Sequence, residues 1–365
     1  MKIAIVHDWL TVFSGAEKVL EQIIICYPDA DIFTTIDTLK DNQRDFLKNK
    51  KVRVSKMQNL PFLKSLYRFY VLLFPNFIKE FDLSSYDLII SSSHAIAKGV
   101  KTSKNQLHIC YIHTPARYVW DLRSQYLKEH DLDKGIKFFF VNRLLDRFKK
   151  WDLCSSKNVD YFIANSNYVK DRVKRIYNRE SVVIYPPVDV KKYQINPIKK
   201  NFYLAASRLV SYKKIDIIID AFLKLPNKKL VVIGDGPEYK KIRNKIADNI
   251  SILGYQSSEN LVHYMKNAKA FIFAADEDFG IMPVEAQACG TPIIAFNKGG
   301  ATETVINNKT GIFFEEQTSK SIFNAVENFE LTKFDPMDIR KNALQFSNKR
   351  FRQEFVDFIN EVMTK

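Results

Sequence analysis

The chain has 365 residues, of which 46% are hydrophobic and 27% are charged, and its formal net charge is +15. This length exceeds the usual size of one hydrophobic core, so it predicts two domains with a cleft between them, and the composition excludes a disordered or repetitive chain. The positive charge favours an anionic partner, with nucleic acid, acidic lipid and phosphorylated substrates as the candidate classes.

We expect a cytoplasmic protein. Only four apolar residues follow Lys2 before a His-Asp pair, too few for the apolar region of a signal peptide. No stretch approaches the roughly 20 apolar residues that a membrane-spanning helix needs. The cysteines are too widely scattered for a zinc knuckle, a CxxC redox pair or a disulfide framework, and they are expected to be reduced and mostly buried: Cys26, Cys110, Cys154 and Cys289.

Short apolar runs rich in β-branched residues alternate with longer helix-like segments, a pattern that predicts parallel sheets wound with helices in an α/β fold. In the first half, strands are expected at residues 2–6, 31–36, 51–54, 87–92, 107–112 and 161–165. In the second half, they are expected at residues 201–206, 229–233, 251–253, 269–274, 292–296 and 311–314.

Residues 185–197 contain three prolines, which forbid a continuous helix or a central strand and mark a linker. We therefore predict one domain over residues 1–190 and a second over 191–347, followed by a helix-like segment over 348–365. Open α/β sheets bind ligands outside the carboxyl ends of their strands, so motifs at strand ends are the candidate sites.

The most specific motif is Glu277-Asp-Phe-Gly280-Ile-Met-Pro283-Val-Glu285, which follows an apolar run. Pro283 suits the first turn of a helix, so the backbone N–H groups just before it can meet an anion, those of Gly280, Ile281 and Met282. Glu277 can accept hydrogen bonds from sugar hydroxyls and Glu285 from ribose hydroxyls. Alternatively, both glutamates are solvated acids that flank the start of a helix.

Two cations stand at the end of another predicted strand. Arg208 offers a planar fork and Lys213 a mobile point charge, a combination suited to a diphosphate, although a solvated basic loop would look the same. The turn that follows residues 229–233 begins at Gly234, which permits a close backbone approach to a nucleotide or simply a tight turn.

Taken together and in this order, these three elements resemble the donor domain of glycosyltransferase family 4. The resemblance implies the GT-B fold, with two Rossmann-like doubly wound domains facing a central cleft. The domain over residues 1–190 would then bind the acceptor and the domain over 191–347 the donor, and residues 348–365 would form a C-terminal crossover helix that packs back on the first domain. Several stretches of the first half look like the bacterial mannosyltransferase branch of this family, which builds O-antigen and related polysaccharides. They are His7-Asp8-Trp9, Ser14-Gly15-Ala16-Glu17, Ser91-Ser-Ser-His94-Ala-Ile-Ala-Lys98-Gly99 and Tyr111-Ile-His113-Thr-Pro-Ala-Arg117-Tyr118-Val-Trp120-Asp121.

The resemblance also implies roles for single residues. Arg208, Lys213 and Glu285 would bind the nucleotide diphosphate, Glu277 the donor sugar and His113 the reacting region. Gly15 would let the loop after the first strand approach the donor phosphate or the acceptor. The catalytic set is then His113, Glu277, Arg208 and Lys213, and the donor-binding set is Gly15, Arg208, Lys213, Gly234, Gly280, Ile281, Met282 and Glu285.

The residues themselves lend His113 independent support. His7, His94 and His113 each follow an apolar strand, so they should converge at one edge of the sheet. His7 and His94 could equally serve to orient loops. The remaining histidines are expected to be structural or exposed, namely His108, His130 and His263.

We expect a retaining, metal-independent transferase with no cofactor, whose substrates are GDP-mannose and a polyprenyl-linked glycan or oligosaccharide acceptor. No Asp-x-Asp follows a strand, and Asp131-Leu-Asp133 is expected in a polar helical stretch. The alternatives are a UDP-sugar donor, an epimerase or phosphorylase on the same fold, and a nucleic-acid-binding module. The last is disfavoured because the lysines are spread along the chain without a nucleic-acid motif.

Residues 60–79 mix aromatic, aliphatic and basic side chains. Such a segment could lie in a membrane interface with its cations near anionic lipid, or it could be a buried helix pair of the first domain.

Overall fold

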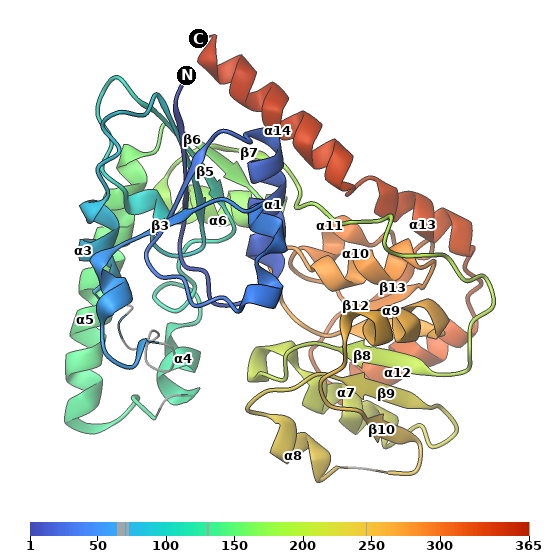
Figure 1. The fold of residues 1–365 in the computed structure, drawn as a ribbon. Coiled ribbons are helices and arrows are strands. Elements are labelled where there is room, and N and C mark those ends of the chain that lie inside the picture. The colour runs from blue at the N-terminus through green and yellow to red at the C-terminus, as the bar shows by residue number, and fades with distance from the viewer. Residues whose placement is uncertain (64–69, 71–72, 130, 246, 365) are drawn as a thin grey trace. The chain divides into compact units, whose positions relative to one another are not determined.

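The computed structural model describes residues 1–365 except 64–69, 71–72, 130, 246 and 365 (Figure 1). The chain divides into two units, which are described separately. The first comprises Met1–Tyr185 and Phe351–Lys365, and the second comprises Pro186–Arg350.

The first unit contains a parallel sheet with the strand order β3-β2-β1-β4-β5-β6-β7. All six strands expected in this half are present. The seventh, β7, was not predicted because its three residues form too short an apolar run, and Val182 is half-exposed. The strands are β1 (Ile3–His7), β2 (Asp31–Thr34), β3 (Val52–Val54), β4 (Leu88–Ser93), β5 (Leu107–Ile112), β6 (Tyr161–Ala164) and β7 (Ser181–Val183).

Helices cover both faces of this sheet, because alternate residues along a strand point to opposite sides. Ile5 belongs to a core cluster with residues of α1 and α14, whereas Ala4 and Val6 belong to a cluster with Phe74 of α3 and Leu145 of α5. The helices are α1 (Gly15–Cys26), α3 (Phe74–Phe77), α4 (Arg123–Glu129), α5 (Gly135–Ser155), α6 (Asn167–Tyr177) and α14 (Asn348–Met363).

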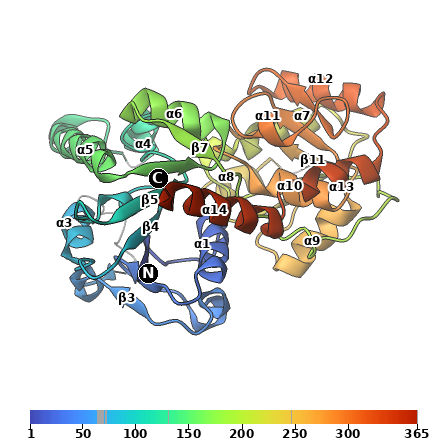
Figure 2. The ribbon, with the colours of Figure 1, turned by 90° about the horizontal axis from the view of Figure 1, so that it is seen from above.

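The C-terminal helix α14 packs on the first unit, as the sequence predicts. Its buried residues Phe351, Phe355, Ile359 and Val362 recur at helical spacing and form one apolar stripe. Figure 2 shows α14 running alongside α1, and both helices contribute to the same core cluster. This apolar stripe therefore determines where the C-terminal helix packs on the first unit.

The second unit contains a parallel sheet with the strand order β10-β9-β8-β11-β12-β13, and its six strands match the six expected. These are β8 (Tyr203–Ala206), β9 (Leu230–Ile233), β10 (Ile250–Ile252), β11 (Ala270–Phe273), β12 (Ile293–Phe296) and β13 (Gly311–Phe314). The helices are α7 (Ile215–Phe222), α8 (Tyr239–Arg243), α9 (Ser258–Asn267), α10 (Ile281–Ala288), α11 (Ala301–Thr304), α12 (Ser319–Glu330) and α13 (Pro336–Leu344).

Both sheets reverse their strand order at a defined place. The reversal lies between β1 and β4 in the first unit and between β8 and β11 in the second. Successive helices leave the sheet on opposite sides at such a switch point, so the strand ends beside it stay uncovered. The loops after these four strands are therefore the places to examine for ligand-binding residues.

Two expectations from the sequence need correction. Asp131-Leu-Asp133 does not lie in a helix: it forms the turn between α4 and α5, where Asp131 has a left-handed φ of 53°. Two of the four cysteines, Cys110 and Cys289, are buried, whereas Cys26 is half-buried and Cys154 is exposed.

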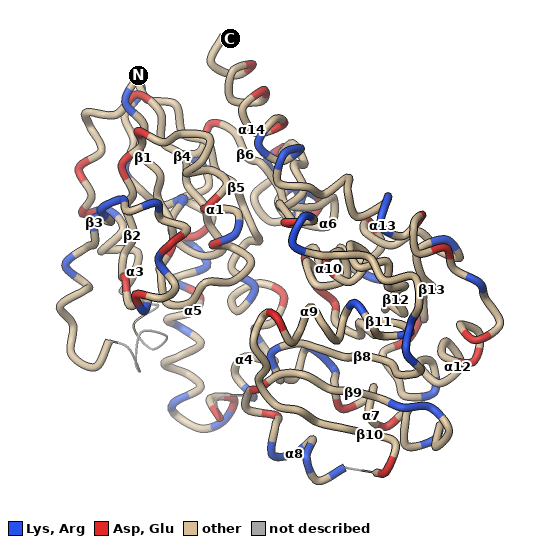
Figure 3. Tube along the Cα trace, turned by 45° about the vertical axis from the view of Figure 1, so that its right-hand side comes forward, with Lys and Arg blue, Asp and Glu red and all other residues tan. Residues whose placement is uncertain are grey.

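The candidate membrane segment 60–79 lies partly outside the described residues, at 64–69 and 71–72. Among its described residues, Leu63, Phe74 and Ile78 are buried in the first unit's core, whereas Phe62 and Leu73 are exposed. Within the described ranges, no helix has both the length and the apolar character needed to cross a membrane. Lys and Arg residues are spread over many elements of both units (Figure 3).

His108 on β5 is structural, as expected. Its Nδ1 lies 3.0 Å from the carbonyl oxygen of Asn158 and its Nε2 lies 2.8 Å from Ser91 Oγ. The carbonyl can only accept, so Nδ1 carries the proton and Nε2 accepts from the serine. Burial lowers the pKa of His108 to about 4.

We predict that His108 makes the folded state acid-sensitive. Between its ordinary pKa of about 6.5 and its folded pKa, the unfolded chain takes up a proton that the folded chain does not, so the free energy of unfolding falls by about 1.4 kcal/mol per pH unit on acidification. Urea unfolding at a series of pH values between these limits should show a shallower decline for His108→Gln than for the wild type. Parallel declines would contradict this assignment.

Candidate functional site

Asp8 organises the switch point of the first unit. It follows β1 directly, it is fully buried, and its carboxylate accepts hydrogen bonds from four consecutive backbone N–H groups, those of His94, Ala95, Ile96 and Ala97. Burial alone would raise the pKa of Asp8, but His94, His7 and the backbone N–H groups outweigh it and hold the pKa well below its ordinary value. A charged Asp8 thus fixes the loop that follows β4.

Three histidines converge here, as the sequence predicts. His94 Nδ1 lies 2.8 Å from Asp8 Oδ2, and the His94 and His113 rings are 6.3 Å apart. Burial by itself would lower the pKa of His94, but the Asp8 carboxylate raises it overall. Burial, together with His94 and His7, lowers the pKa of His113 to about 3. Asp8 thus favours the charged form of His94, whereas the surroundings of His113 favour its neutral form.

A chain of hydrogen bonds connects His113 to a buried glutamate. Ser92 Oγ lies 2.9 Å from His113 Nε2 and 3.1 Å from His7 Nδ1, while His7 Nε2 lies 3.4 Å from Glu17 Oε1. The other oxygen of Glu17 accepts from the Ser14 backbone N–H and hydroxyl at 2.9 Å each. Glu17 therefore joins the first turn of α1, which begins at Gly15, to the histidine cluster.

Lys98 anchors the far end of the same loop. Its ammonium is 1% exposed and lies 2.5 Å from Asp152 Oδ1 on α5. Asp152 also accepts from Trp120 Nε1 at 2.8 Å and from the Tyr177 hydroxyl at 2.7 Å. A side chain at Gly99 would collide with Trp151, since its Cβ would lie 2.3 Å from that ring. Residues 94–99 are thus held by one buried carboxylate at each end.

In the second unit, the structure brings two of the predicted site residues into direct contact. Lys213 follows β8 and Glu277 follows β11, and their side chains form an ion pair at the switch point. Both side chains are partly exposed. Arg208, two residues after β8, is exposed. Two cations and a carboxylate therefore stand at the uncovered edge of this sheet.

Two glycines that the sequence analysis did not single out hold the Glu277 loop. The backbone N–H of Gly300 donates to the Glu277 carbonyl at 2.8 Å. A Cβ on Gly299 would lie 2.4 Å from that carbonyl oxygen, and one on Gly300 would lie 2.2 Å from the Cα of Phe279. A pair of adjacent glycines, separated by two residues from the end of the predicted strand 292–296, was the signal available in the sequence.

Gly234 has a different neighbour from the one expected. At its φ of 144°, a Cβ would lie 1.8 Å from the backbone carbonyl oxygen of Ser207. The close approach that this glycine permits in the structure is thus to the loop carrying Arg208. Its expected contact with a nucleotide stays a prediction.

The start of α10 presents backbone donors as predicted. Gly280 is the residue before the helix, with a left-handed φ of 85°, and no described side chain caps it. Pro283 has no N–H group, so the donors of the first turn belong to Ile281 and Met282. Glu285, one turn further, is buried and hydrogen-bonded to the Tyr193 hydroxyl, whose pKa is raised by burial and by this carboxylate. Tyr193 was not predicted, because it lies in the linker segment.

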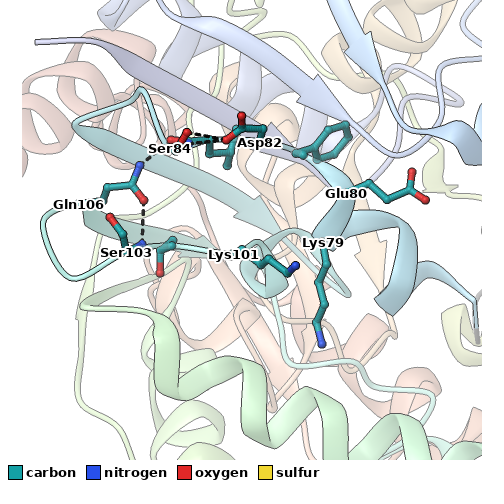
Figure 4. A pocket seen from close by; sticks show the side chains of 10 residues that line it. Lys79, Glu80, Asp82, Ser84, Lys101, Ser103 and Gln106 are labelled. Atoms are coloured by element: carbon teal, nitrogen blue, oxygen red, sulfur yellow. Dashed lines mark hydrogen bonds between the residues drawn. The ribbon is translucent and has the colours of Figure 1, made fainter.

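Two hollows of the first unit lie away from the switch point. One of about 360 Å³ is lined by residues such as Lys79, Asp82 and Lys101, which precede the starts of β4 and β5 (Figure 4). Another of about 610 Å³ lies at the start of β1 and β2. Both are at the amino ends of strands, whereas the histidines follow the carboxyl ends.

Across the described ranges, no three histidine, cysteine or acidic side chains are grouped so that they could hold a metal ion. Metal independence stays a prediction from the sequence.

Two family models match the chain. Residues 13–192 match the model described as Glycosyltransferase Family 4, and residues 189–346 match the model described as Glycosyl transferases group 1. An uncharacterized glycosyltransferase of Methanocaldococcus jannaschii is 32% identical over 205 residues, which are 53% of this chain and 56% of that protein. The GDP-mannose-dependent alpha-(1-6)-phosphatidylinositol monomannoside mannosyltransferase of Mycobacterium tuberculosis is 28% identical over 194 residues, 44% of this chain and 50% of that protein. The chain thus spans about half the length of these curated relatives.

Solved structures of similar fold match nearly the whole chain. The lipopolysaccharide outer core galactosyltransferase WaaB has a TM-score of 0.69 at 20% identity, with 99% of each chain covered. HepE of Anabaena, solved in complex with UDP and glucose, has a TM-score of 0.71 at 21% identity, also with 99% of each chain covered. Both likenesses show two Rossmann-like domains of the GT-B type. With its two halves matched by the two family models, the chain belongs to the family 4 glycosyltransferases.

Proposed function

We propose that the protein is a retaining glycosyltransferase that transfers mannose from GDP-mannose to a lipid-linked or oligosaccharide acceptor in the synthesis of a bacterial surface polysaccharide. The observation that carries this proposal is the ion pair of Lys213 with Glu277 beside Arg208, at the switch point of the second sheet. Relatives named as GDP-mannose-dependent mannosyltransferases support the choice of donor.

The second unit's switch point has the charges that a nucleotide-sugar diphosphate requires. Lys213 has three N–H donors, so it can keep Glu277 and still bind a phosphate oxygen. Arg208 adds a bidentate fork, and the N–H groups at the start of α10 add partial positive charge. Glu277, oriented by Lys213, accepts from hydroxyls of the donor sugar. Glu285, one of whose hydrogen bonds goes to Tyr193, accepts from the ribose.

The chemistry follows from where charge develops. The bond between the anomeric carbon and the leaving phosphate breaks, a bond from that carbon to the acceptor oxygen forms on the same face, and the acceptor proton passes to the leaving phosphate. Negative charge grows on the phosphate as the transition state is approached. Arg208 and Lys213 therefore bind the transition state more strongly than the donor.

His113 of the first unit presents a hydrogen-bond acceptor to a substrate hydroxyl. Ser92 has one hydroxyl proton but two imidazole neighbours, so one ring must donate to it. When the His7 ring carries a single proton, that proton lies on Nε2, because the Glu17 carboxylate facing Nε2 can only accept, and His7 Nδ1 then accepts from Ser92. Ser92 then accepts from His113 Nε2–H, and His113 Nδ1 keeps its lone pair.

The diphosphate contact of the second unit predicts large kinetic effects. Arg208→Ala and Lys213→Ala should each lower turnover at saturating substrates by about 30-fold to 1000-fold, which corresponds to about 2–4 kcal/mol, because each removes a charge-assisted contact that strengthens in the transition state. Lys240→Ala, an exposed lysine on α8 of the same unit, is the matched control and should change turnover little.

The pair also predicts coupling between its members. The double variant Lys213→Ala/Glu277→Gln should lose less activity than the product of the two single losses, because each single change already disrupts the same pair. If Arg208→Ala and Lys213→Ala both keep near-wild-type turnover and donor affinity, the donor site lies elsewhere.

The histidine chain predicts a tautomer. At about pH 8, where an ordinary imidazole is neutral, nitrogen NMR should show the proton of His113 on Nε2 in the wild type. Ser92→Ala and Glu17→Gln should redistribute this proton and lower turnover more than donor affinity. A proton on His113 Nδ1 in the wild type would refute the assigned direction of the chain.

A donor screen tests the proposed substrate. GDP-mannose should raise the temperature of thermal unfolding and support turnover, since a ligand that binds the folded state stabilises it by mass action. The same turnover should persist in a metal chelator. Stabilisation and turnover with UDP-sugars alone would establish the alternative donor, and epimerised sugar formed without acceptor would replace the transferase by an epimerase.

A further inference from the structure

The outer face of α5 is unusual for a soluble surface. Ile136, Phe139 and Phe140 are 75%, 66% and 59% exposed, and all three stand within the first two turns of the helix. Single exposed apolar residues are ordinary, but neighbouring large ones mark a surface that another body covers.

Basic residues continue this face along the helix. Arg143, Arg147 and Lys150 are exposed. Arg143 follows Phe139 by four residues, Arg147 follows Arg143 by four and Lys150 follows Arg147 by three, which places them on the same side of the helix. The one exposed acid of α5, Asp146, is bound by Arg123 at 2.6 Å. The face is therefore an apolar tip followed by a positively charged stripe.

The opposite side of α5 is fixed in the unit. Leu145 and Phe148 are buried in the core, and Asp152 receives Lys98. The core cluster that contains them also contains Leu63 and Phe74 of the segment 60–79. The exposed tip cannot turn inward without breaking these contacts, so its exposure is built into the fold.

We propose that this outer face of α5 docks on the surface of an anionic lipid bilayer. Phenyl rings and an isoleucine enter the boundary between headgroups and acyl chains, and arginine and lysine beside them attract acidic headgroups. A second copy of the chain is a poorer occupant, because a two-fold interface would place two positive stripes against each other. The inference does not depend on which sugar donor or acceptor the enzyme uses.

The experiment is sedimentation of the full chain with vesicles of phosphatidylcholine, with and without phosphatidylglycerol. The wild type should sediment with the vesicles that contain phosphatidylglycerol, and high salt should weaken this binding. The pairs Phe139→Ser/Phe140→Ser and Arg143→Glu/Arg147→Glu should each weaken binding by at least about tenfold.

Two matched pairs serve as controls in the second unit. Ile198→Ser/Leu331→Ser removes two equally exposed apolar side chains, and Lys320→Glu/Lys333→Glu makes the same change of charge, so both should bind like the wild type. Circular dichroism and donor-induced stabilisation should be unchanged in all four variants, which separates this proposal from the donor proposal.

Absence of binding to vesicles with phosphatidylglycerol would overturn the proposal, as would binding that both α5 pairs leave intact. Concentration-dependent self-association that only Phe139→Ser/Phe140→Ser abolishes, without vesicle binding, would assign the face to a second copy instead.

Discussion

Parallel strands deliver all their carboxyl ends to one edge of a sheet, and the chemistry of this protein depends on that constraint. Where the strand order reverses, between β1 and β4 and between β8 and β11, helices leave on opposite sides and the strand ends stay uncovered. Polar side chains of different strands and loops can therefore gather there. His7, Asp8 and Ser92 occupy this place in the first unit, and Lys213 and Glu277 occupy it in the second.

The two units stabilise charge at this edge by different means. In the first, Asp8 is withdrawn from water and its charge is compensated by backbone N–H groups and His94, so contacts within the unit hold the loop after β4. In the second, Lys213 and Glu277 compensate each other at a partly exposed position. Because this pair is partly open to solvent, it can be reached from outside, as the proposed contacts with a diphosphate and a sugar require.

The helix α5 contributes to both the site and the surface of the first unit. Its inner side supplies Asp152, which holds Lys98 and with it the end of the loop that begins at His94. Its outer side carries Phe139 and Phe140 in solvent. A single rigid element therefore connects the proposed lipid-docking face to the loop beside His113, with no hinge needed within the helix.

Local sequence patterns were sufficient to predict much of the fold and part of the candidate site. Apolar runs and prolines predicted twelve strands and the two-part chain, because strand and helix periodicity are properties of a few neighbouring residues. The return of the C-terminal helix to the first domain was expected from the family resemblance. Glycines and charged residues just after predicted strands indicated Lys213, Glu277 and the three histidines as site residues, because the carboxyl ends of parallel strands lie at the same edge of a sheet. Tertiary structure decided the rest: that Ser92 links two histidines, that Tyr193 meets Glu285, that Gly299 and Gly300 support the Glu277 loop, and that Phe139 and Phe140 face outward. Each of these depends on contacts between segments far apart in the chain or on which side of a helix is left uncovered, and neither is determined by local sequence.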